Sequence, residues 1–241
     1  MGLREQEAEE MKHGLFAVAV ATALSGAAYG GVWMDDFESY APGTLMDNIG
    51  GWAGWDGDSQ FAGSISDLVS YDGNNSLFIS GAADAVHPFS GLTSGSFVIT
   101  AQQYIPTSSF NGDTYFIVNN EYNAGGPYTW AIEIQFDIAT GNVLDDFRDE
   151  ANVIPIVFDE WVEISIEIDL DNNTQSTYYG GTLLSTGDWT TGAGDALEIA
   201  NIDLFSTGGA AYYDGMSIIP APGVLALLGL AGLAGTRRRR N

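Results

Sequence analysis

Apolar and polar residues alternate strictly over residues 162–170, directly after Trp161. Every second position from Val162 to Leu170 holds Val, Ile or Leu, and Glu, Ser or Asp stands between them. Because successive side chains of a strand point to opposite faces, this pattern predicts a strand with one buried and one solvated face. Residues 131–138 show the same alternation, so we expect the middle of the chain to consist of half-buried strands.

Short strand-like segments separated by turns fill the rest of this region. Gly, Asn and Asp mark the turns, as in Asn111-Gly112-Asp113 and Gly125-Gly126-Pro127. No long stretch has helical periodicity, and no linker or fixed-period repeat divides the region. We therefore predict one all-β domain over residues 31–219, an antiparallel β-sandwich or jelly roll. Further strands are expected at residues 76–80, 96–105, 113–119, 177–179, 197–205 and 212–218.

The middle of the chain is strongly acidic. The chain has 32 Asp and Glu against 7 Lys and Arg, and within residues 31–219 the only basic residue is Arg148. Such a domain repels phosphate backbones, so we expect no nucleic-acid partner. Two interpretations stay open: the acids form a solvated surface that keeps the protein soluble, or some of them bind divalent cations.

The chain offers few residues for thiol or imidazole chemistry. It has no cysteine and two histidines, His13 and His87. Nucleophilic cysteines, thiolate metal sites and multi-histidine zinc sites are therefore excluded. Only His87 could serve in a Ser-His-Asp triad, because His13 lies in the leader.

The N-terminal region is typical of a secretory signal peptide. Met11-Lys12-His13 precedes an apolar segment at residues 14–23, and small residues follow. This order predicts export and cleavage, with Ala28 and Gly30 at the −3 and −1 positions. Residues 1–30 are thus expected to hold an upstream extension and the signal peptide, with Met11 as the true start.

The last 22 residues combine three features. A proline-rich tripeptide and an apolar segment at residues 224–235 precede a terminal arginine cluster. The tripeptide consists of Pro220, Ala221 and Pro222, and the cluster consists of Arg237, Arg238, Arg239 and Arg240. The apolar segment is short for a bilayer crossing, and the arginines favour the cytoplasmic side. Residues 220–241 are therefore expected to form a hydrophobic anchor helix.

This C-terminal arrangement resembles the PEP-CTERM sorting signal of Gram-negative bacteria, with Ala221 in place of the motif's glutamate. The resemblance implies export machinery and an exosortase-like processing enzyme as partners. It also implies a transient anchor in the inner membrane, before the protein reaches the cell envelope, the outer surface or the exterior. A tail anchor without processing is the alternative.

Residues 161–189 resemble concanavalin A-like, or laminin-G-like, jelly rolls. They combine a strand opened by Trp, an Asp-Asn turn, a strand at residues 177–184 and a loop of small residues. A closing strand such as residues 212–218, which pairs with an opening segment such as residues 35–38, is also common in that family. The resemblance implies binding of carbohydrate or protein, although fold alone does not fix function.

Four carboxylates are candidate ligands of a structural Ca²⁺ ion, the one cofactor that the sequence suggests. They are Asp35, Asp36, Glu38 and Asp214, from the opening and closing strands of the expected jelly roll. Ca²⁺ takes oxygen ligands of this kind. In so acidic a domain such clusters also arise by chance, which is the alternative.

Two tryptophans in a glycine-rich segment are candidates for glycan binding. Trp52 and Trp55 stand three residues apart, and Asp56 follows. Sugar rings can stack their CH faces on indoles, while a carboxylate accepts hydrogen bonds from hydroxyls. Four tyrosines could extend this platform: Tyr122, Tyr128, Tyr178 and Tyr179. The alternative is packing in the core, where tryptophan buries a large area.

The sequence contains no convincing catalytic site, so we expect that the chain is not an enzyme. Retaining glycosidases on related jelly rolls need two nearby carboxylates, often as Glu-x-Asp-x-x-Glu on one strand. Glu167-Ile168-Asp169 matches the first half, but residue 172 is Asn.

The main functional hypothesis is therefore a non-enzymatic secreted or cell-surface protein of the envelope, which interacts with extracellular polysaccharide or matrix. The first alternative is a lectin-like carbohydrate-binding module with Ca²⁺. The second alternative is a glycoside hydrolase on the same fold.

Overall fold

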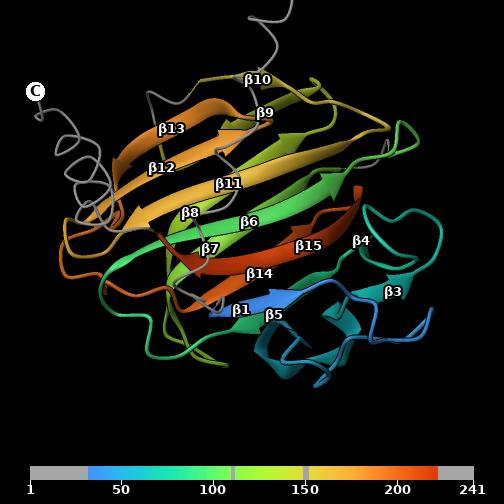
Figure 1. The fold of residues 1–241 in the computed structure, drawn as a ribbon, viewed down its shortest axis with the longest axis horizontal. Coiled ribbons are helices and arrows are strands. Elements are labelled where there is room, and N and C mark those ends of the chain that lie inside the picture. Colours follow the sequence, from blue (N-terminus) through green and yellow to red (C-terminus); the bar gives the residue numbers. More distant parts are fainter. Residues whose placement is uncertain (1–31, 110–111, 149–151, 222–241) are drawn as a thin grey trace, which may run out of the picture. The chain divides into compact units, whose positions relative to one another are not determined.

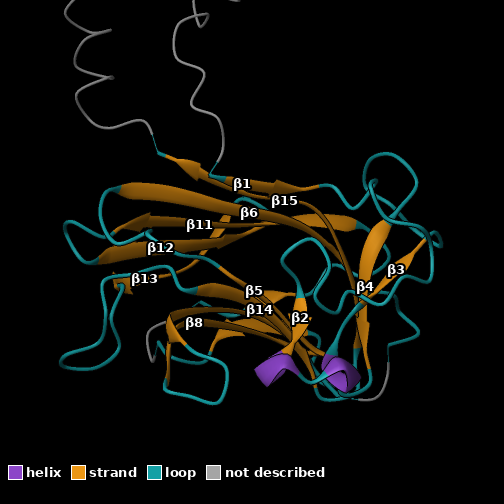
Figure 2. Cartoon of the chain, turned by 90° about the horizontal axis from the view of Figure 1, so that it is seen from below, coloured by secondary structure: helices purple, strands orange, loops and turns teal. Residues whose placement is uncertain are grey.

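The computed structural model describes residues 32–109, 112–148 and 152–221. These residues form two antiparallel β-sheets that pack face to face (Figures 1 and 2). The predicted all-β class and antiparallel sandwich are confirmed. An opening strand does pair with the closing strand as expected, but it covers residues 33–35, so only Asp35 of the predicted segment 35–38 takes part.

The first sheet faces the viewer in Figure 1 and has eight strands in the described part of the chain. Its order is β13 (Thr182–Asp188), β12 (Thr174–Tyr179), β11 (Trp161–Asp169), β6 (Ser96–Tyr104), β15 (Ala210–Pro220), β4 (Ser76–Ser80) and β3 (Ser64–Ser66). The short strand β1 (Trp33–Asp35) pairs with β15.

The second sheet lies behind the first and has seven strands within the described ranges. Its order is β10 (Ile154–Pro155), β9 (Asn142–Asp145), β8 (Tyr128–Asp137), β7 (Thr114–Tyr122), β14 (Asn201–Ser206), β5 (Asp84–Pro88) and β2 (Ala53–Gly54). Two short 3₁₀ helices follow β2: η2 (Trp55–Gly57) and η3 (Ser59–Phe61). Figure 2 shows them below β2, on the side of this sheet that faces away from the first sheet.

The alternating pattern of β11 sorts its side chains as predicted. The four aliphatic side chains from Val162 to Ile168 are buried between the sheets, whereas Glu163 and Glu167 are exposed. Each fully buried aliphatic side chain of this kind contributes about 1.5–3 kcal/mol to folding. The largest side chains of the same core include Trp52, Trp189, Tyr213, Phe116 and Phe136.

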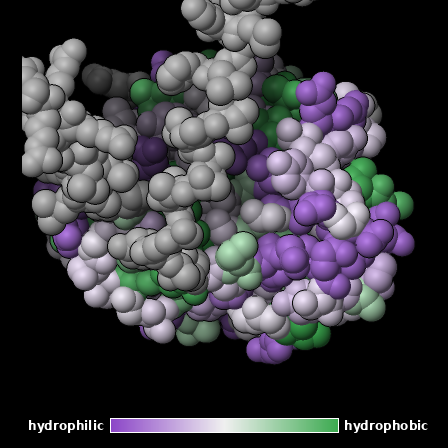
Figure 3. Space-filling view, viewed as in Figure 1, coloured by the Kyte–Doolittle hydropathy of each residue, from purple (hydrophilic) through white to green (hydrophobic). Residues whose placement is uncertain are grey.

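The outer face of the first sheet is largely polar. Figure 3 views this face, and where it is uncovered, hydrophilic residues dominate and hydrophobic residues form small separate patches. Antiparallel sheets commonly bury one face and solvate the other in this way. An aromatic group on this face therefore stands out from its surroundings.

The described chain begins and ends on neighbouring strands. The amide of Val32 donates a hydrogen bond to the carbonyl of Ile218 in β15 (2.9 Å). Pro220 still belongs to β15, and the amide of Ala221 donates to a carbonyl of β6 (2.8 Å). The first two residues of the predicted sorting motif thus continue the sheet, and Pro222 lies outside the described residues.

The predicted signal peptide, with Ala28 and Gly30, lies outside the described residues, and so do Arg237 to Arg240. In the part of the chain that the structure describes, no helix combines the length and apolar character that a membrane crossing requires.

Candidate functional site

The outer face of the second sheet carries acidic side chains in its central strands. Along β14, Ile202 and Leu204 point into the core, so Asp203 between them lies on the outer face. Asp203 is opposite Val86 of β5 and opposite Ile117 of β7. Val86 and Ile117 are buried but do not belong to the core between the sheets, which agrees with this placement.

Three carboxyl groups form what we call the carboxyl row: Asp84, Asp203 and Glu133. Asp84 of β5 is diagonal to Asp203 on the neighbouring strand. Glu133 of β8 is opposite Ile117, which in turn is opposite Asp203. Glu133 is therefore two strands away from Asp203, with about 10 Å between the Cα atoms.

The carboxyl groups of Asp84 and Asp203 lie next to each other, and each has a buried Oδ1 atom without a hydrogen-bond partner among the described residues. A hydrogen bond between the two side chains forms only when one of the carboxyls is protonated. Asp203 is 3 % exposed. Burial raises the pKa of both groups, and the neighbouring Asp84 raises the pKa of Asp203 further. Because two adjacent carboxylates cannot both ionise without strong repulsion, the pair keeps a proton above the pH at which an exposed aspartate loses it.

Glu133 is a separate acid at the other end of the carboxyl row. Its side chain is half-buried. Burial raises the pKa of Glu133, and the charges of Asp146 and Asp145 raise it further. The row thus combines a pair of carboxyls with raised pKa values and a third carboxyl group two strands away.

Four aromatic side chains form a cluster next to the carboxyl row, which we call the Trp55 cluster: Trp55, Tyr122, Tyr128 and Trp130. The ring of Trp55 lies 4.8 Å from the rings of both tyrosines. Trp130 is 6.5 Å from Trp55 and nearly parallel to it, with 17° between the ring planes. All four side chains are half-buried, so part of each ring remains open to solvent.

The pKa of Tyr122 links the Trp55 cluster to the carboxyl row. Burial raises the pKa of Tyr122, and a hydrogen bond from the amide of Asp56 opposes this shift. The charges of Asp56, Asp203 and Asp84 raise the pKa further. Because such effects act over short distances, the Tyr122 hydroxyl lies near the row.

Asp56 fixes the Trp55 cluster in place. Its φ of 57° lies in the left-handed region, which aspartate tolerates better than most residues. The Tyr128 hydroxyl donates to both carboxylate oxygens (2.8 and 2.7 Å), and the amide of Gly125 donates to one of them (2.8 Å). The amide of Asp56 donates to the Tyr122 hydroxyl (3.2 Å). These bonds hold η2 against the β7–β8 hairpin.

Two buried asparagines continue the site between the row and the cluster. Asn119 of β7 is opposite Asn201 of β14 and opposite Trp130 of β8, and both asparagines are 0 % exposed. The backbone amide of Asn119 donates to the side-chain oxygen Oδ1 of Asn201 (3.1 Å). Within the described residues, the side-chain amide of Asn119 and Nδ2 of Asn201 have no hydrogen-bond partner. Buried groups of this kind are usually bonded to ordered water or a ligand, because leaving them unpaired costs about 1–3 kcal/mol.

The structure separates the two tryptophans of the predicted glycan platform. The Trp52 side chain is 0 % exposed and packs in the core against Trp33 and Phe37. The structure does bring Trp55 and Asp56 together at the surface, with the two tyrosines of the Trp55 cluster. The other two tyrosines of the prediction, Tyr178 and Tyr179, lie on β12 of the first sheet, so they do not extend this platform.

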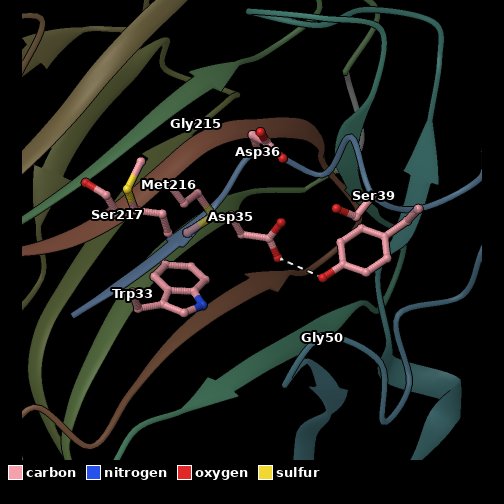
Figure 4. A pocket seen from close by; sticks show the side chains of 10 residues that line it. Trp33, Asp35, Asp36, Ser39, Gly50, Gly215, Met216 and Ser217 are labelled. Carbon is pink, nitrogen blue, oxygen red and sulfur yellow. Dashed lines mark hydrogen bonds between the residues drawn. The ribbon is translucent and has the colours of Figure 1, made fainter. Parts of the chain in front are cut away.

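Asp35 and Asp36, two of the predicted Ca²⁺ ligands, line a cavity of about 430 Å³ beside β1 and β15 (Figure 4). The Asp35 carboxylate accepts a hydrogen bond from the Tyr40 hydroxyl (3.5 Å), which is drawn as the dashed line in Figure 4. Asp35 also accepts hydrogen bonds from the amide of Phe37 (2.9 Å) and the indole of Trp52 (3.0 Å). Burial raises the pKa of Asp35 despite these bonds. Asp35 therefore serves to fix a turn and a core tryptophan.

The other two predicted ligands bind backbone amides of a neighbouring loop. Glu38 accepts from Asn74 and Asn75 (2.8 and 2.7 Å), which lowers its pKa. Asp214 accepts from Tyr71 (2.7 Å). Across the described ranges, no group of three or more His, Cys, Asp or Glu residues could hold a metal ion. The structure thus does not assemble the four predicted ligands into one metal site.

His87 and Glu167 do not form a catalytic site. His87 is buried in β5, where Nε2 lies 3.2 Å from the carbonyl of Gly50 and the ring packs against Trp33 and Trp52. Burial lowers the pKa of His87, which favours the neutral imidazole. Glu167 is exposed on β11.

Our sequence reasoning missed the carboxyl row. The sequence does contain a signal for these buried acids, because each stands alone between apolar residues. Asp203 stands between Ile202 and Leu204, and Asp84 stands between Ala83 and Ala85. Alternation along β14 predicts that Asp203 lies on the outer face, but local pattern does not reveal that β5 is its neighbour.

No family model matches the chain, and no curated protein sequence matches it. Solved structures do. The chain is similar to an endo-β-1,4-glucuronan lyase from the fungus Trichoderma reesei, with 9 % identity and a TM-score of 0.53, over 79 % of this chain and 96 % of that chain. It is also similar to the globular domain of T. cruzi calreticulin, with 11 % identity and a TM-score of 0.50, over 79 % of this chain and 92 % of that chain. These likenesses show a shared β-sandwich fold.

The comparison contradicts our main functional hypothesis of a non-enzymatic envelope protein. The glucuronan lyase, matched over nearly its full length, is an enzyme named for its action on a polysaccharide. The finding favours the second alternative, a glycoside hydrolase on this fold, over that hypothesis. At 9 % identity the likeness concerns the fold, so the expectation that this chain is not an enzyme stays a prediction.

Proposed function

We propose that the domain is a lectin-like module that binds an uncharged glycan chain on the outer face of the second sheet. The observation that carries this proposal is the Trp55 cluster, four half-buried rings held by Asp56 beside the carboxyl row. Aromatic rings and a few placed polar groups are the usual parts of a ligand site. Here the rings would contact the CH faces of sugars, and the carboxyl and amide groups would bind hydroxyls.

Charge distinguishes an uncharged glycan from an acidic one. Arg148 is the only basic residue between residues 31 and 219. It donates a hydrogen bond to the carbonyl of Asp188 (2.8 Å) and lies 4.0 Å from Asp145, so it is already engaged. An acidic polysaccharide would meet the carboxyl row without any opposing charge. The proposed ligand therefore differs in charge from the substrate in the glucuronan lyase's name.

We also propose that the domain is exported and presented at the cell envelope or outside the cell. The signal-peptide pattern and the PEP-CTERM-like residues 220–241 support this. Export machinery and an exosortase-like enzyme would be its processing partners, and the C-terminal segment would hold it in the membrane before processing.

Trp55→Ala is expected to weaken binding of a neutral polysaccharide about tenfold or more, since a central aromatic contact commonly contributes more than about 1.4 kcal/mol. Titration calorimetry of the full-length chain with xyloglucan, galactomannan and laminarin would measure this, with alginate as the acidic comparison. Tyr178→Ala, a half-buried aromatic position outside the site, is the matched control. Equal affinity of the wild type for alginate and the neutral chains, or unchanged binding in Trp55→Ala, would refute the proposal.

Hydrolysis of the bound glycan is a second candidate function, and the carboxyl row is the observation that favours it. Hydrolysis needs a carboxylic acid that protonates the leaving oxygen and a carboxylate that activates water or attacks the sugar. The Asp84–Asp203 pair keeps a proton, and Glu133 lies two strands away.

Glu133→Gln is expected to lower the release of reducing ends from a neutral polysaccharide by about 100-fold or more, because general acid–base groups contribute at least that factor. Binding should persist, since the amide keeps an acceptor at this position. A reducing-end assay beside calorimetry separates the two effects. If no neutral polysaccharide that binds is cleaved by the wild type, this candidate is removed and the binding proposal stands.

A further inference from the structure

A row of aromatic side chains crosses the outer face of the first sheet. We call it the aromatic row, and it consists of Phe78, Tyr212, Tyr104 and Trp161. They come from β4, β15, β6 and β11, which lie side by side at the front of Figure 1. Each ring is opposite the next in the strand register, and the successive ring centroids are 4.7, 6.1 and 5.6 Å apart.

Alternation places the row on the solvent side of the sheet. The neighbours of its members in the strands, such as Leu77, Tyr213 and Val162, belong to the core between the sheets. Phe78, Tyr104 and Trp161 are half-buried. Tyr71, from the loop before β4, is 55 % exposed and lengthens the row, with its ring 6.1 Å from Trp161. Tyr212, in the middle, is 8 % exposed because its neighbours cover it.

Polar side chains lie directly beside this row, two residues further along the strands. Gln102 is opposite Glu163, and its amide donates to the Glu163 carboxylate (3.4 Å). Beyond them, Thr100 is opposite both Ser217 and Ser165, and the hydroxyls of Thr100 and Ser217 are 2.8 Å apart. A strip of aromatic rings thus runs parallel to a strip of amide, carboxylate and hydroxyl groups.

This arrangement matches the chemistry of an extended polyhydroxylated chain. Sugar rings present apolar CH faces and polar edges, so one chain could contact both strips at once. Aromatic pairs across strands also stabilise sheets, but that effect does not require a continuous row on a face that is otherwise polar. No basic residue lies on the described strands of this sheet, so an acidic chain would find no partner for its charges.

We propose that the aromatic row is a second contact surface for uncharged polysaccharide, on the face of the sandwich opposite the Trp55 cluster. It goes beyond the proposed function, which concerns the outer face of the second sheet. A domain with both surfaces binds two chains, or two segments of one chain, and so bridges them. Bridging raises the apparent affinity for a polymer above that for a short oligosaccharide.

The test removes the two surfaces separately in the full-length chain. The variants are Trp55→Ala, Trp161→Ala and the double variant, each titrated beside the wild type with xyloglucan, galactomannan and laminarin. We expect Trp55→Ala to keep residual binding, and the double variant to lose about tenfold or more of that residual affinity. Turbidity of mixtures with the polymer should fall in either single variant, because bridging needs both surfaces.

The outcomes distinguish this inference from the proposed function. The second surface is refuted if Trp55→Ala has no residual binding, or if the double variant binds as tightly as Trp55→Ala. The aromatic row would then only stabilise the sheet. If Trp161→Ala lowers binding while Trp55→Ala does not, the aromatic row stands and the proposed function fails. Tyr71→Ala covers the case in which Trp161→Ala unfolds the domain. The Tyr71 side chain projects from an exposed loop, so the Tyr71→Ala variant should fold normally. Combined with Trp55→Ala, it should still weaken the residual binding severalfold.

Discussion

Trp52→Ala is expected to lower the free energy of unfolding by about 3–5 kcal/mol, the usual cost of removing a large buried aromatic side chain. The Trp52 side chain is 0 % exposed and contacts the rings of Trp33, Phe37 and His87. Its indole also donates to Asp35 (3.0 Å), so the substitution leaves a cavity and removes one donor from a half-buried carboxylate. For a domain of this size the melting temperature should fall by roughly 6–20 °C.

Urea unfolding of the full-length chain, followed by far-ultraviolet circular dichroism, measures this effect. Trp55→Ala is the matched control because it removes the same side chain three residues away. Since Trp55 is half-buried in the surface cluster, that variant should lose no more than about 1–2 kcal/mol. Equal losses in the two variants would contradict the assignment of Trp52 to the core and Trp55 to the surface.

The different fates of Trp52 and Trp55 show where sequence reasoning ends. The segment between β1 and β3 has little regular structure: Trp52 forms an isolated bridge with Ile49, and Trp55 starts a 3₁₀ turn. Neither the period of a strand nor that of a helix applies there, so the sequence pattern did not separate the fully buried indole of Trp52 from the half-buried indole of Trp55. In β11, by contrast, a regular period of two assigned each side chain to its face correctly.

Contacts between distant strands could be predicted where a family resemblance supplied them, and not otherwise. The concanavalin A-like resemblance led us to expect that an opening strand pairs with the closing strand. The structure shows this pairing between β1 and β15, with only Asp35 of the expected segment 35–38 in β1. The four carboxylates near these strands were nevertheless wrongly grouped as metal ligands, because the sequence does not show which backbone amides will occupy them. Glu38, for example, accepts from Asn74 and Asn75.

The two surfaces of the proposals depend on strand order in the same way. The carboxyl row exists because β5 lies next to β14, although Asp84 and Asp203 are far apart in the sequence. The aromatic row likewise needs β4, β15, β6 and β11 to be neighbours in register. The alternation pattern of each strand predicts only which face of the sheet a residue occupies. Which acids or rings meet on that face follows from the topology of the sandwich.

Asp203→Asn is expected to make the domain more stable at pH 8 and to give no gain at pH 4. Burial, and then the neighbouring Asp84, raise the pKa of Asp203 well above 3.8 in the folded protein. A raised folded-state pKa means that the folded state binds the proton more tightly than the unfolded state. The pair therefore contributes stability that is fully present below about pH 4 and is lost as the pH rises through the folded-state pKa values.

Asparagine removes this loss because it does not ionise and can donate a hydrogen bond to Asp84. The expected gain at pH 8 is about 1–3 kcal/mol, the cost of a buried polar group without a good partner, or roughly 2–12 °C in melting temperature. Melting curves at pH 4, 6 and 8 and constant ionic strength would measure it. Burial also raises the pKa of Asp35, so part of the wild-type pH dependence should persist in the variant.

Asp137→Asn is the control of opposite sign. Hydrogen bonds from Thr140 lower the pKa of Asp137, so its stabilising contribution is present above pH 3.8 and is lost as the pH falls through the folded-state pKa. This variant should not gain stability at pH 8. A pH-independent change in Asp203→Asn, or a loss of stability at pH 8, would show that Asp84 and Asp203 do not share a proton. The acid that hydrolysis requires would then be missing from the carboxyl row, whereas glycan binding by the Trp55 cluster would be unaffected.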